Sequence, residues 1–527
     1  MAPHGDEDEE KSLRDPLLLP DEQEEKLVQD GSLDFYGSPA VASKTGGSRL
    51  STPPALLVFM LCCSLSLYGV SYNLVLFMVS KLGLSNAAAA TQVSIWTGVH
   101  DLSPLLVAYV SDSHLGRFKT TLGGSLIYSF GLALLSLSVL LVENKVRVTW
   151  LFFVALYVIA LGKGFVASLL AFGADQFDGK DPVEAARKSS YFNWYYFSSS
   201  MGLLLAVVGV VYIEDRLGFS SALFVCTGAI LFGIMIFSSA TKFYRYASNL
   251  TGNPFAGLSD HSNFAGIFLV WLGSVMYEAM RAQTFSLFVE QAALMNTKVG
   301  SFRVPPASLN CFDPISVLVW TVVYDRVLVP VMRRGTGNSR GFTFFQRMGA
   351  GLVVMTGAMA CAAVLEARRL ANFHDERGQI NVLWQIPQFA LVGGSKVFYY
   401  VGLIEFLYDQ APENLRTLSA AMAFFSASVG SFLSGFLVSI TSSITGERGW
   451  IPRDLNDGHL DYFFWLLVAL GVANWLFFLA SSRSYKFKDL HNSNDYDGDN
   501  GDIGDLGGSE LEELALLEAA NIGVAPM

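Results

Sequence analysis

The chain contains about twelve separate segments of roughly twenty or more mostly apolar residues, the length that a helix needs to cross a bilayer. Inside lipid every backbone N–H and C=O must find its partner within the protein, so we expect helices and not strands. The composition agrees, since 52% of the residues are hydrophobic and only 15% are charged. The sequence therefore predicts an all-α membrane protein. Its segments run over residues 55–80, 86–111, 119–142, 149–173, 188–213, 217–239, 263–290, 310–332, 341–366, 381–408, 415–441 and 460–482.

The longest polar stretch between these segments, residues 241–262, divides them into two groups of six. We therefore expect an N-terminal half at residues 53–240 and a C-terminal half at residues 263–485. Two six-helix halves around a site near the middle of the membrane are the plan of facilitator-type transporters. An even number of crossings places both tails and the central loop on one side, which we take as the cytoplasm. The sequence leaves open whether the membrane is the plasma membrane or the vacuolar membrane.

The net charge of −11 is concentrated in the two tails, which we place at residues 1–52 and 486–527. Residues 1–50 and residues 483–527 each carry a net charge of −7, which leaves about +3 for the body of the chain. This distribution is unlike that of a nucleic-acid-binding protein. We expect disordered acidic tails that are available for contacts with other proteins, around a body that is embedded in membrane lipid.

Lys396 and Arg281 each lie inside a long apolar segment. A charge at this depth is costly unless it faces a wet cavity or a partner, so such residues often mark a functional site. Two cations that face one cavity would suit an anion. The alternative is that each is neutralised by a carboxylate and only holds helices together. Glu278, one turn before Arg281, is such a partner, and Lys396 has candidates in Glu405, Glu278 or Asp101.

Three further ionisable residues are either proton carriers or members of ion pairs: Glu278, His100 and Asp101. His100 is the only histidine of seven within a predicted membrane segment. It is either a structural hydrogen-bonding residue or a group that takes part in proton transfer. Asp101 follows it directly, but adjacent side chains on a helix point about 100° apart, so the two need not act together.

The sequence contains no motif that indicates an enzyme. The five cysteines lack the spacing of a zinc or redox site, so we expect neither a metal nor a cofactor. The stretch GKGFVAS at residues 162–168 lies within an apolar helix and is not a phosphate-binding loop.

Seven stretches of the chain have recognisable motifs: SDSHLGRFKT (111–120), AFGADQFD (171–178), FNWYYF (192–197), SLFVEQ (286–291), VPPASLNCFDPISVLVWTVVYDRVLVP (304–330), WQIPQFALVGGSKVF (384–398) and FLYDQAPENLR (406–416). Together they closely resemble the proton-dependent oligopeptide transporter family, in its plant nitrate/peptide transporter branch. The resemblance implies the major facilitator fold, alternating access and a substrate cavity between the halves.

The chain departs from this family at the positions that usually couple transport to protons. The family's Glu-x-x-Glu-Arg cluster in the first helix is replaced by MLCCS at residues 60–64. The position of the family's helix-four lysine is Val166, with Lys163 three residues away. Helix ten carries Lys396 where relatives commonly have glutamate. We therefore expect the usual proton relay to be absent.

The same positions bear on the substrate. Lysine in place of glutamate in helix ten reverses the sign of that site. Arg281 occupies a slot that resembles a histidine position of a nitrate-transporting relative, and arginine suits planar oxyanions. We expect Lys396, Arg281, Tyr68, Gln283 and Trp194 to bind substrate. The loop between helices two and three, with Asp175, is expected to control gating through Asp112, Gly116 and Arg117.

The sequence thus predicts a transporter of a small anion, nitrate first and an organic anion second, which lacks the family's usual proton-coupling motif. One alternative is a proton-coupled symporter of a peptide or another organic solute that uses Glu278, His100 or Asp101 as proton carrier. Another is a sensor or scaffold protein with little transport.

Overall fold

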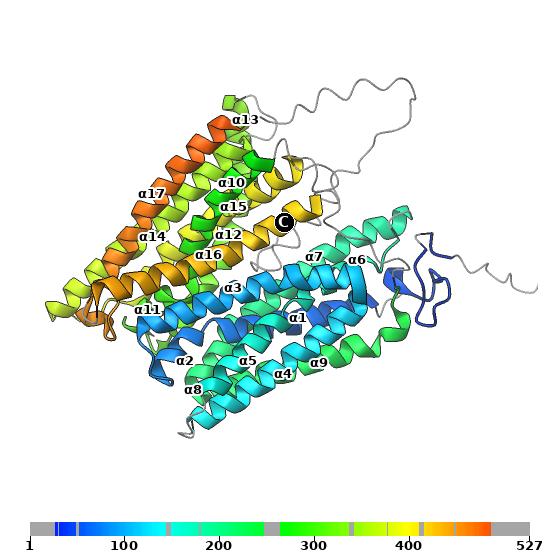
Figure 1. The fold of residues 1–527 in the computed structure, drawn as a ribbon, viewed down its shortest axis with the longest axis horizontal. Helices are drawn as coiled ribbons and strands as arrows, with labels where there is room; N and C mark the ends of the chain where they lie inside the picture. Colours follow the sequence, from blue (N-terminus) through cyan, green and yellow to red (C-terminus); the bar gives the residue numbers. More distant parts are fainter. Residues whose placement is uncertain are drawn as a thin grey trace, which may run out of the picture.

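The computed structural model describes residues 27–29, 31–48, 52–143, 149–178, 181–246, 264–336, 342–376, 378–410, 416–446 and 449–485. In this part the protein is almost entirely helical, which confirms the predicted all-α fold (Figure 1). Strands β1 (Lys298–Val299) and β2 (Phe302–Arg303) form a small antiparallel hairpin. The expected tail at residues 486–527 and residues 247–263 of the central loop lie outside the described residues.

The N-terminal half follows the predicted order of six membrane segments, several of which are made of two helices in line. They are α1 (Thr52–Ser71) with α2 (Leu74–Ser80), α3 (Asn86–Val110), α4 (Arg117–Glu143), α5 (Thr149–Gly162) with α6 (Phe165–Ala174), α7 (Pro182–Leu205) with α8 (Val211–Leu217), and α9 (Phe219–Ser239). The π-helical turn η2 (Ser111–Leu115) follows α3, and η3 (Ala206–Val210) joins α7 to α8.

The C-terminal half repeats this arrangement and again contains interrupted helices. Its segments are α10 (Phe264–Arg281) with the 3-10 turn η5 (Ala282–Phe285) and α11 (Leu287–Ala293), η6 (Pro306–Cys311) with α12 (Phe312–Val323), the π-helical turn η7 (Tyr324–Leu328) and α13 (Val329–Thr336), α14 (Phe344–His374), η8 (Val382–Gln385) with α15 (Ile386–Gln410), α16 (Arg416–Thr445), and α17 (Leu460–Ser484) after η10 (Leu455–Asp457).

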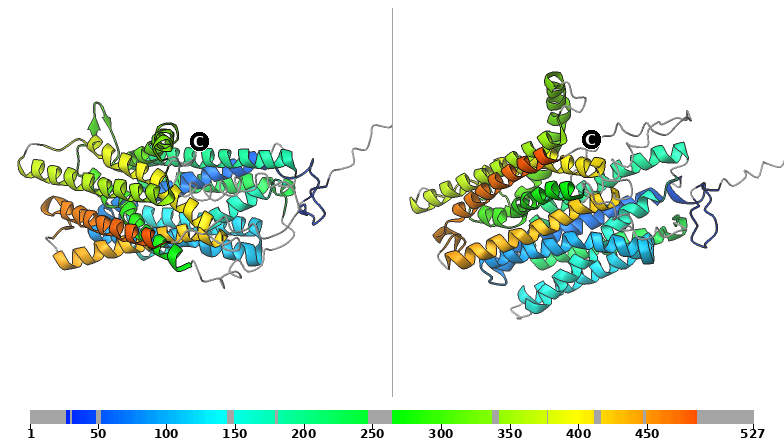
Figure 2. Two further views of the ribbon diagram at one scale, coloured as in Figure 1. Left: turned by 90° about the horizontal axis from the view of Figure 1, so that it is seen from above. Right: turned by 45° about the horizontal axis from the view of Figure 1, so that its top comes forward.

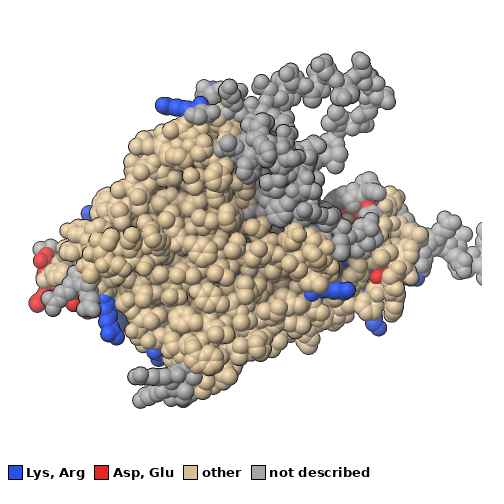
Figure 3. Space-filling model, viewed as in Figure 1, with Lys and Arg blue, Asp and Glu red and all other residues tan. Residues whose placement is uncertain are grey.

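Among the described residues, nine helical stretches are long and apolar enough to cross a membrane. Three further segments, α3, α10 with α11, and α15, do not meet this criterion although they lie within the same bundle. These three segments carry His100 and Asp101, Glu278 and Arg281, and Lys396, respectively. A helix that lines a wet cavity does not need to be uniformly apolar. Large apolar side chains such as Phe130, Phe224, Met235 and Phe436 are exposed on the outside of the bundle. Figure 3 shows few charged side chains on the face it presents, as expected for a surface that contacts lipid.

The described residues next to each tail lie beside the helix ends that flank the central linker, on the side of the bundle called here the tail side. Leu33 pairs with Tyr246, which follows α9, through backbone hydrogen bonds of 2.8 and 2.9 Å. Tyr485, at the end of α17, packs against Phe406 and lies beside Gly266 at the start of α10. The described part of the N-terminal tail therefore adjoins the end of α9, and the described end of the chain adjoins the start of α10.

Part of the expected N-terminal tail packs against the N-terminal half. Arg245, which is fully buried, donates to both carboxylate oxygens of Glu184 at 2.6 and 3.0 Å and to the backbone oxygen of Thr45 at 3.1 Å. Residues 31–48 thus cover a buried ion pair at the tail-side end of α7.

On the side away from the tails, the two halves are joined along α3 and α16, which lie side by side (Figures 1 and 2). Ser94 and Ser434 share a hydrogen bond of 3.2 Å, and Ser428 donates to the backbone oxygen of Gly98 at 2.8 Å. At the outer end, Asn86 donates to the backbone oxygen of Arg453 at 3.0 Å. The halves are therefore in contact on this side in the observed state.

Candidate functional site

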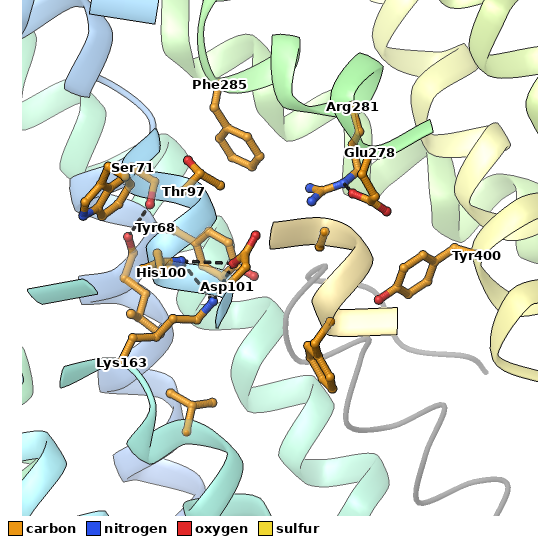
Figure 4. Close-up of a pocket in the computed structure, with 15 residues that line it drawn as sticks. Tyr68, Ser71, Thr97, His100, Asp101, Lys163, Glu278, Arg281, Phe285 and Tyr400 are labelled. Carbon is orange, nitrogen blue, oxygen red and sulfur yellow. Dashed lines mark hydrogen bonds and ion pairs between the residues drawn. The ribbon is translucent and has the colours of Figure 1, made fainter. Parts of the chain in front are cut away.

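A cavity of about 60 Å³ lies between the halves, next to the hydrogen bond from Ser428 on α16 to Gly98 on α3. Side chains from both halves line it, and Figure 4 shows them converging from opposite sides. Its polar and charged lining residues are Tyr68, Ser71, Thr97, His100, Asp101, Lys163, Glu278, Arg281 and Tyr400.

The N-terminal half contributes a cluster of three ionisable groups, His100, Asp101 and Lys163, which we call the His–Asp–Lys cluster. The Lys163 ammonium lies 2.9 Å from Asp101 Oδ1 and 3.0 Å from His100 Nδ1. Asp101 Oδ1 is also 3.2 Å from the same ring nitrogen. The two neighbouring residues of α3 therefore belong to one cluster, because Lys163, in the turn between α5 and α6, contacts both of them.

Glycines on both sides of Lys163 explain how this residue reaches α3. A side chain on Gly164 would collide with Val107 and would lie 2.8 Å from the backbone oxygen of Ser103. A side chain on Gly162 would lie 2.7 Å from the backbone of Tyr128 on α4. The interruption between α5 and α6 can therefore approach α3 closely, since it carries no side chain at either flanking position.

The C-terminal half contributes an ion pair on one helix. Arg281, the last residue of α10, donates through Nε to Glu278 Oε2, three residues earlier. Glu278 is almost fully buried, whereas the Arg281 side chain is 12% exposed and its guanidinium points into the cavity (Figure 4). The expected pairing of the two residues is thus present, and both also line the cavity.

Lys396 is placed differently from the expectation. It is buried on α15, where its ammonium lies 2.6 Å from Asp313 Oδ2 on α12, and it does not belong to the cavity lining. The partners considered from the sequence, Glu405, Glu278 and Asp101, did not include Asp313. Glu278 and Asp101 instead pair with Arg281 and Lys163.

Tyr68 lines the cavity, but two other residues expected to bind substrate do not. Gln283 is buried in the turn after α10 and donates to Ser434 Oγ at 2.9 Å, beside the contact between the halves. Trp194 is 55% exposed and packs against Phe197 on the outer side of α7, a common position for tryptophan in a membrane helix.

The residues expected to control gating lie at the tail side. Arg117 Nη1 donates to Asp175 Oδ1 at 2.6 Å and joins the start of α4 to the end of α6. Gly116 has a φ of +80°, which glycine adopts without strain, and it separates η2 from α4. The side chain of Asp112 lies outside the described residues. The Arg117–Asp175 pair lies within the N-terminal half, so it stabilises that half and does not itself bridge the two.

The sequence interpretation missed two members of these ion pairs, Lys163 and Asp313. The glycines that flank Lys163 were a usable signal, because a charged residue between two glycines in an apolar helix indicates close packing with a neighbour. Asp313 gave a weaker signal, since its partner lies 83 residues later.

Comparisons with known proteins agree with this architecture. The POT family model matches residues 118–266 and 258–451. The chain belongs to the POT family. It is 34% identical to Protein NRT1/PTR FAMILY 8.3 of Arabidopsis thaliana, over 90% of this chain and 97% of that protein. It is also 34% identical to Protein NRT1/PTR FAMILY 8.1 of the same plant, over 89% and 99%.

Solved structures of POT transporters share the fold. The crystal structure of the POT family transporter PepTSo has a TM-score of 0.69 and 19% identity, over 82% of this chain and 98% of that one. A structure of the peptide transporter POT in complex with sulfate has a TM-score of 0.68 and 14% identity, over 84% and 97%. The chain is therefore a multi-pass membrane transporter with the major facilitator fold.

Proposed function

We propose that this transporter moves a small anion by alternating access, with nitrate as the first candidate and an organic anion as the second. Arg281 is the principal contact, and Lys163 provides a second positive charge across the cavity. This differs from the expectation that Lys396 and Arg281 act together, because the Lys396 ammonium is bonded to Asp313 outside the cavity lining.

The observation that carries the proposal is the orientation of Arg281. Its Nε is bonded to Glu278, and no hydrogen bond of the described residues involves its two terminal nitrogens. Those nitrogens face the cavity, where their planar arrangement matches two oxygens of an oxyanion (Figure 4). The cavity volume of about 60 Å³ suits an ion as small as nitrate, since one water needs about 10–15 Å³ of such space.

A second candidate is a small zwitterionic solute, such as a short peptide. The carboxylates of Asp101 and Glu278 line the same cavity as the two cations and could receive an ammonium group. The solved structures of similar fold include a peptide transporter. A protein that binds its ligand without moving it, as a sensor would, is the third possibility.

We also propose that the protein resides in the plasma membrane or the vacuolar membrane with both tails in the cytoplasm. Leu33 pairs with Tyr246 before the central loop, and Tyr485 lies beside Gly266 after it, which supports a common side for both tails and that loop. The cavity does not contain the family's usual charged cluster from helix one, since that stretch of α1 reads Met60 to Ser64. Any coupling to protons must therefore use other groups.

The test compares two ion pairs of the same half. Arg281→Gln with Glu278→Gln removes the pair that lines the cavity without leaving an unpaired charge. Lys396→Met with Asp313→Asn does the same for a pair outside the lining. Nitrate affinity of the purified transporter should fall about 10- to 100-fold in the first variant, because hydrogen bonds to charged groups contribute about 1.5–3 kcal/mol. It should change less than about twofold in the second variant, as expected for a site without ligand contact.

Each outcome bears on a different possibility. Equal nitrate affinity in the Arg281/Glu278 variant and the parent would refute Arg281 as the contact. Uptake of a dipeptide but not of nitrate into proteoliposomes would favour the zwitterionic solute. Nitrate binding without uptake would favour the sensor.

A further inference from the structure

The three groups of the His–Asp–Lys cluster compete for one ring nitrogen. Lys163 Nζ, which can only donate, lies 3.0 Å from His100 Nδ1, and Asp101 Oδ1, which can only accept when ionised, lies 3.2 Å from it. The nitrogen cannot serve both at once. When it carries no proton it accepts from Lys163, and when it is protonated it donates to Asp101.

The other ring nitrogen is consistent with the unprotonated state of Nδ1. His100 Nε2 is buried and has no hydrogen-bond partner among the described residues. A neutral imidazole that accepts at Nδ1 carries its proton on Nε2. The ring of Trp96, 4.9 Å away between centroids, packs against the imidazole and restricts its rotation.

The charges around the cavity determine what a bound anion would do. With His100 neutral, the cations Lys163 and Arg281 balance the carboxylates Asp101 and Glu278. An anion that enters this site adds one uncompensated negative charge in a poorly solvated place, which is costly. One proton taken up at the same time removes that cost.

We propose that His100 takes up one proton when an anion binds, and that this proton releases the Lys163 ammonium from the imidazole to the anion. A proton from water adds to the Nδ1 lone pair, and the hydrogen bond from Lys163 to Nδ1 breaks. The new Nδ1–H donates to Asp101 Oδ1. Lys163 keeps its three protons and donates one hydrogen bond into the cavity. The proposal rests on the proposed function, and it makes this transporter a proton–anion symporter through groups other than the family's usual relay.

Among the described residues, no ionisable side chain other than Asp101 and Lys163 forms a hydrogen bond or ion pair with His100. Besides Asp101 and Lys163, the ionisable groups that line its cavity are Tyr68, Glu278 and Arg281. Helix α16 has no ionisable residue from Phe424 to Thr445, and α6 and α2 have none. Four more ionisable residues lie on elements packed against α3: Tyr157 on α5, Glu290 on α11, and Asp112 and His114 on the π-helical turn η2. None of them is among the described residues that line the cavity.

The first experiment uses the unaltered protein. Potassium nitrate is added to the purified transporter in weakly buffered detergent with a pH indicator, and potassium gluconate serves as the control salt. Nitrate does not titrate in this range, so any proton taken up is bound by the protein. Near pH 7 we expect uptake of about one proton per bound nitrate. The affinity should fall about tenfold for each pH unit between the pH at which His100 titrates in the free protein and the higher pH at which it titrates with nitrate bound.

Variants then assign the proton. His100→Asn places an amide oxygen near the position of Nδ1, where it can accept from Lys163 but cannot take a proton. Its nitrate affinity should become independent of pH between about pH 5 and 8, the range in which imidazole side chains usually titrate. Lys163→Met should also abolish the pH dependence, because the released ammonium is missing. His374→Asn is the control, since its ring bonds to the backbone of Leu370 at the end of α14, outside the cavity.

Failure of the coupling and failure of the proposed function give different results. No nitrate binding by the parent at any pH overturns both. Nitrate binding without proton uptake by the parent overturns only the role of His100, whatever happens to the folding of the variants. A His100→Asn protein that keeps the parent's pH dependence overturns it as well.

Discussion

The two halves contribute two different clusters of charged side chains to the same cavity: a Glu–Arg pair from the C-terminal half and the His–Asp–Lys cluster from the N-terminal half. The Glu278–Arg281 pair comes from one turn of α10, so local helix geometry alone assembles it. The His–Asp–Lys cluster requires α3 to meet the junction of α5 and α6, 62 residues away in sequence. One cluster is set by local sequence, and the other exists only because the half has folded.

This difference suggests that the C-terminal half attracts the anion and the N-terminal half takes up the proton. A guanidinium keeps its charge throughout the physiological pH range, so the C-terminal half offers a constant attraction to an anion. The N-terminal half holds an imidazole, whose charge changes in that range. Binding and proton coupling would then be located on opposite sides of the cavity, where the motion of one half against the other can link them.

The largest predicted effect comes from removing the carboxylate of each cluster. Asp101→Asn leaves Lys163, whose side chain is only 4% exposed, without a counter-charge, and should cost about 3–5 kcal/mol of unfolding free energy. Glu278→Gln should cost less, about 1.5–3 kcal/mol, because Arg281 faces the cavity and can be hydrated there. Denaturant titration in detergent micelles measures both.

The double variant Asp101→Asn with Lys163→Met serves as the control and should recover most of the loss. If Glu278→Gln proved the more damaging single change, the Arg281 guanidinium would be more poorly hydrated than its position indicates.

Much of the fold could be predicted from the length and hydropathy of the segments, which do not depend on tertiary contacts. Apolar segments of sufficient length predicted the membrane helices, including the order of the two halves. The interruption at Lys163 was not predicted, because segment 149–173 has the length and hydropathy of one continuous membrane helix, with Lys163 as its single charged residue. The interruption after Arg281 was also missed, since hydropathy reports length and not the backbone path. Both interruptions adjoin the cavity.

The site was only partly predictable for the same reason. Arg281, Glu278, His100 and Asp101 line the cavity, and each was singled out as an ionisable residue within a membrane segment; Tyr68, expected to bind substrate, lines it too. Such polarity cannot tell which side chains share a cavity. Lys396 has the same character as Arg281 in the sequence, but its partner Asp313 comes from a different helix.

A smaller effect separates the charge of Arg281 from its shape. Arg281→Lys keeps the positive charge beside Glu278 but loses the planar fork, so nitrate affinity should fall about tenfold, or about 1.4 kcal/mol. Arg369→Lys is a matched control, because Arg369 pairs with Glu366 at the same spacing on α14, outside the cavity. Isothermal titration of nitrate into each variant makes the comparison. Full affinity in Arg281→Lys would mean that only the charge matters.

The smallest predicted effect concerns the contact between the halves. Ser94 and Ser434 share a hydrogen bond across α3 and α16, whereas Ser136 and Thr227 share one of equal length, 3.2 Å, inside the N-terminal half. Ser94→Ala removes about 1 kcal/mol from the closed arrangement only, so the open population on this side should rise about fivefold. Ser136→Ala stabilises neither arrangement over the other and should leave that population unchanged.

Spin labels at the ends of α3 and α17 away from the tails would report the distance between the halves in both variants.

The same measurement, made with nitrate at two pH values, tests whether the proton is bound in the closed arrangement. If an anion and a proton bind together in the closed arrangement, nitrate at low pH should restore closure in the Ser94→Ala protein, since binding energy can offset a deficit of about 1 kcal/mol. Nitrate at high pH should restore it less. An open population that responds equally to nitrate at both pH values would place the proton outside the closing step.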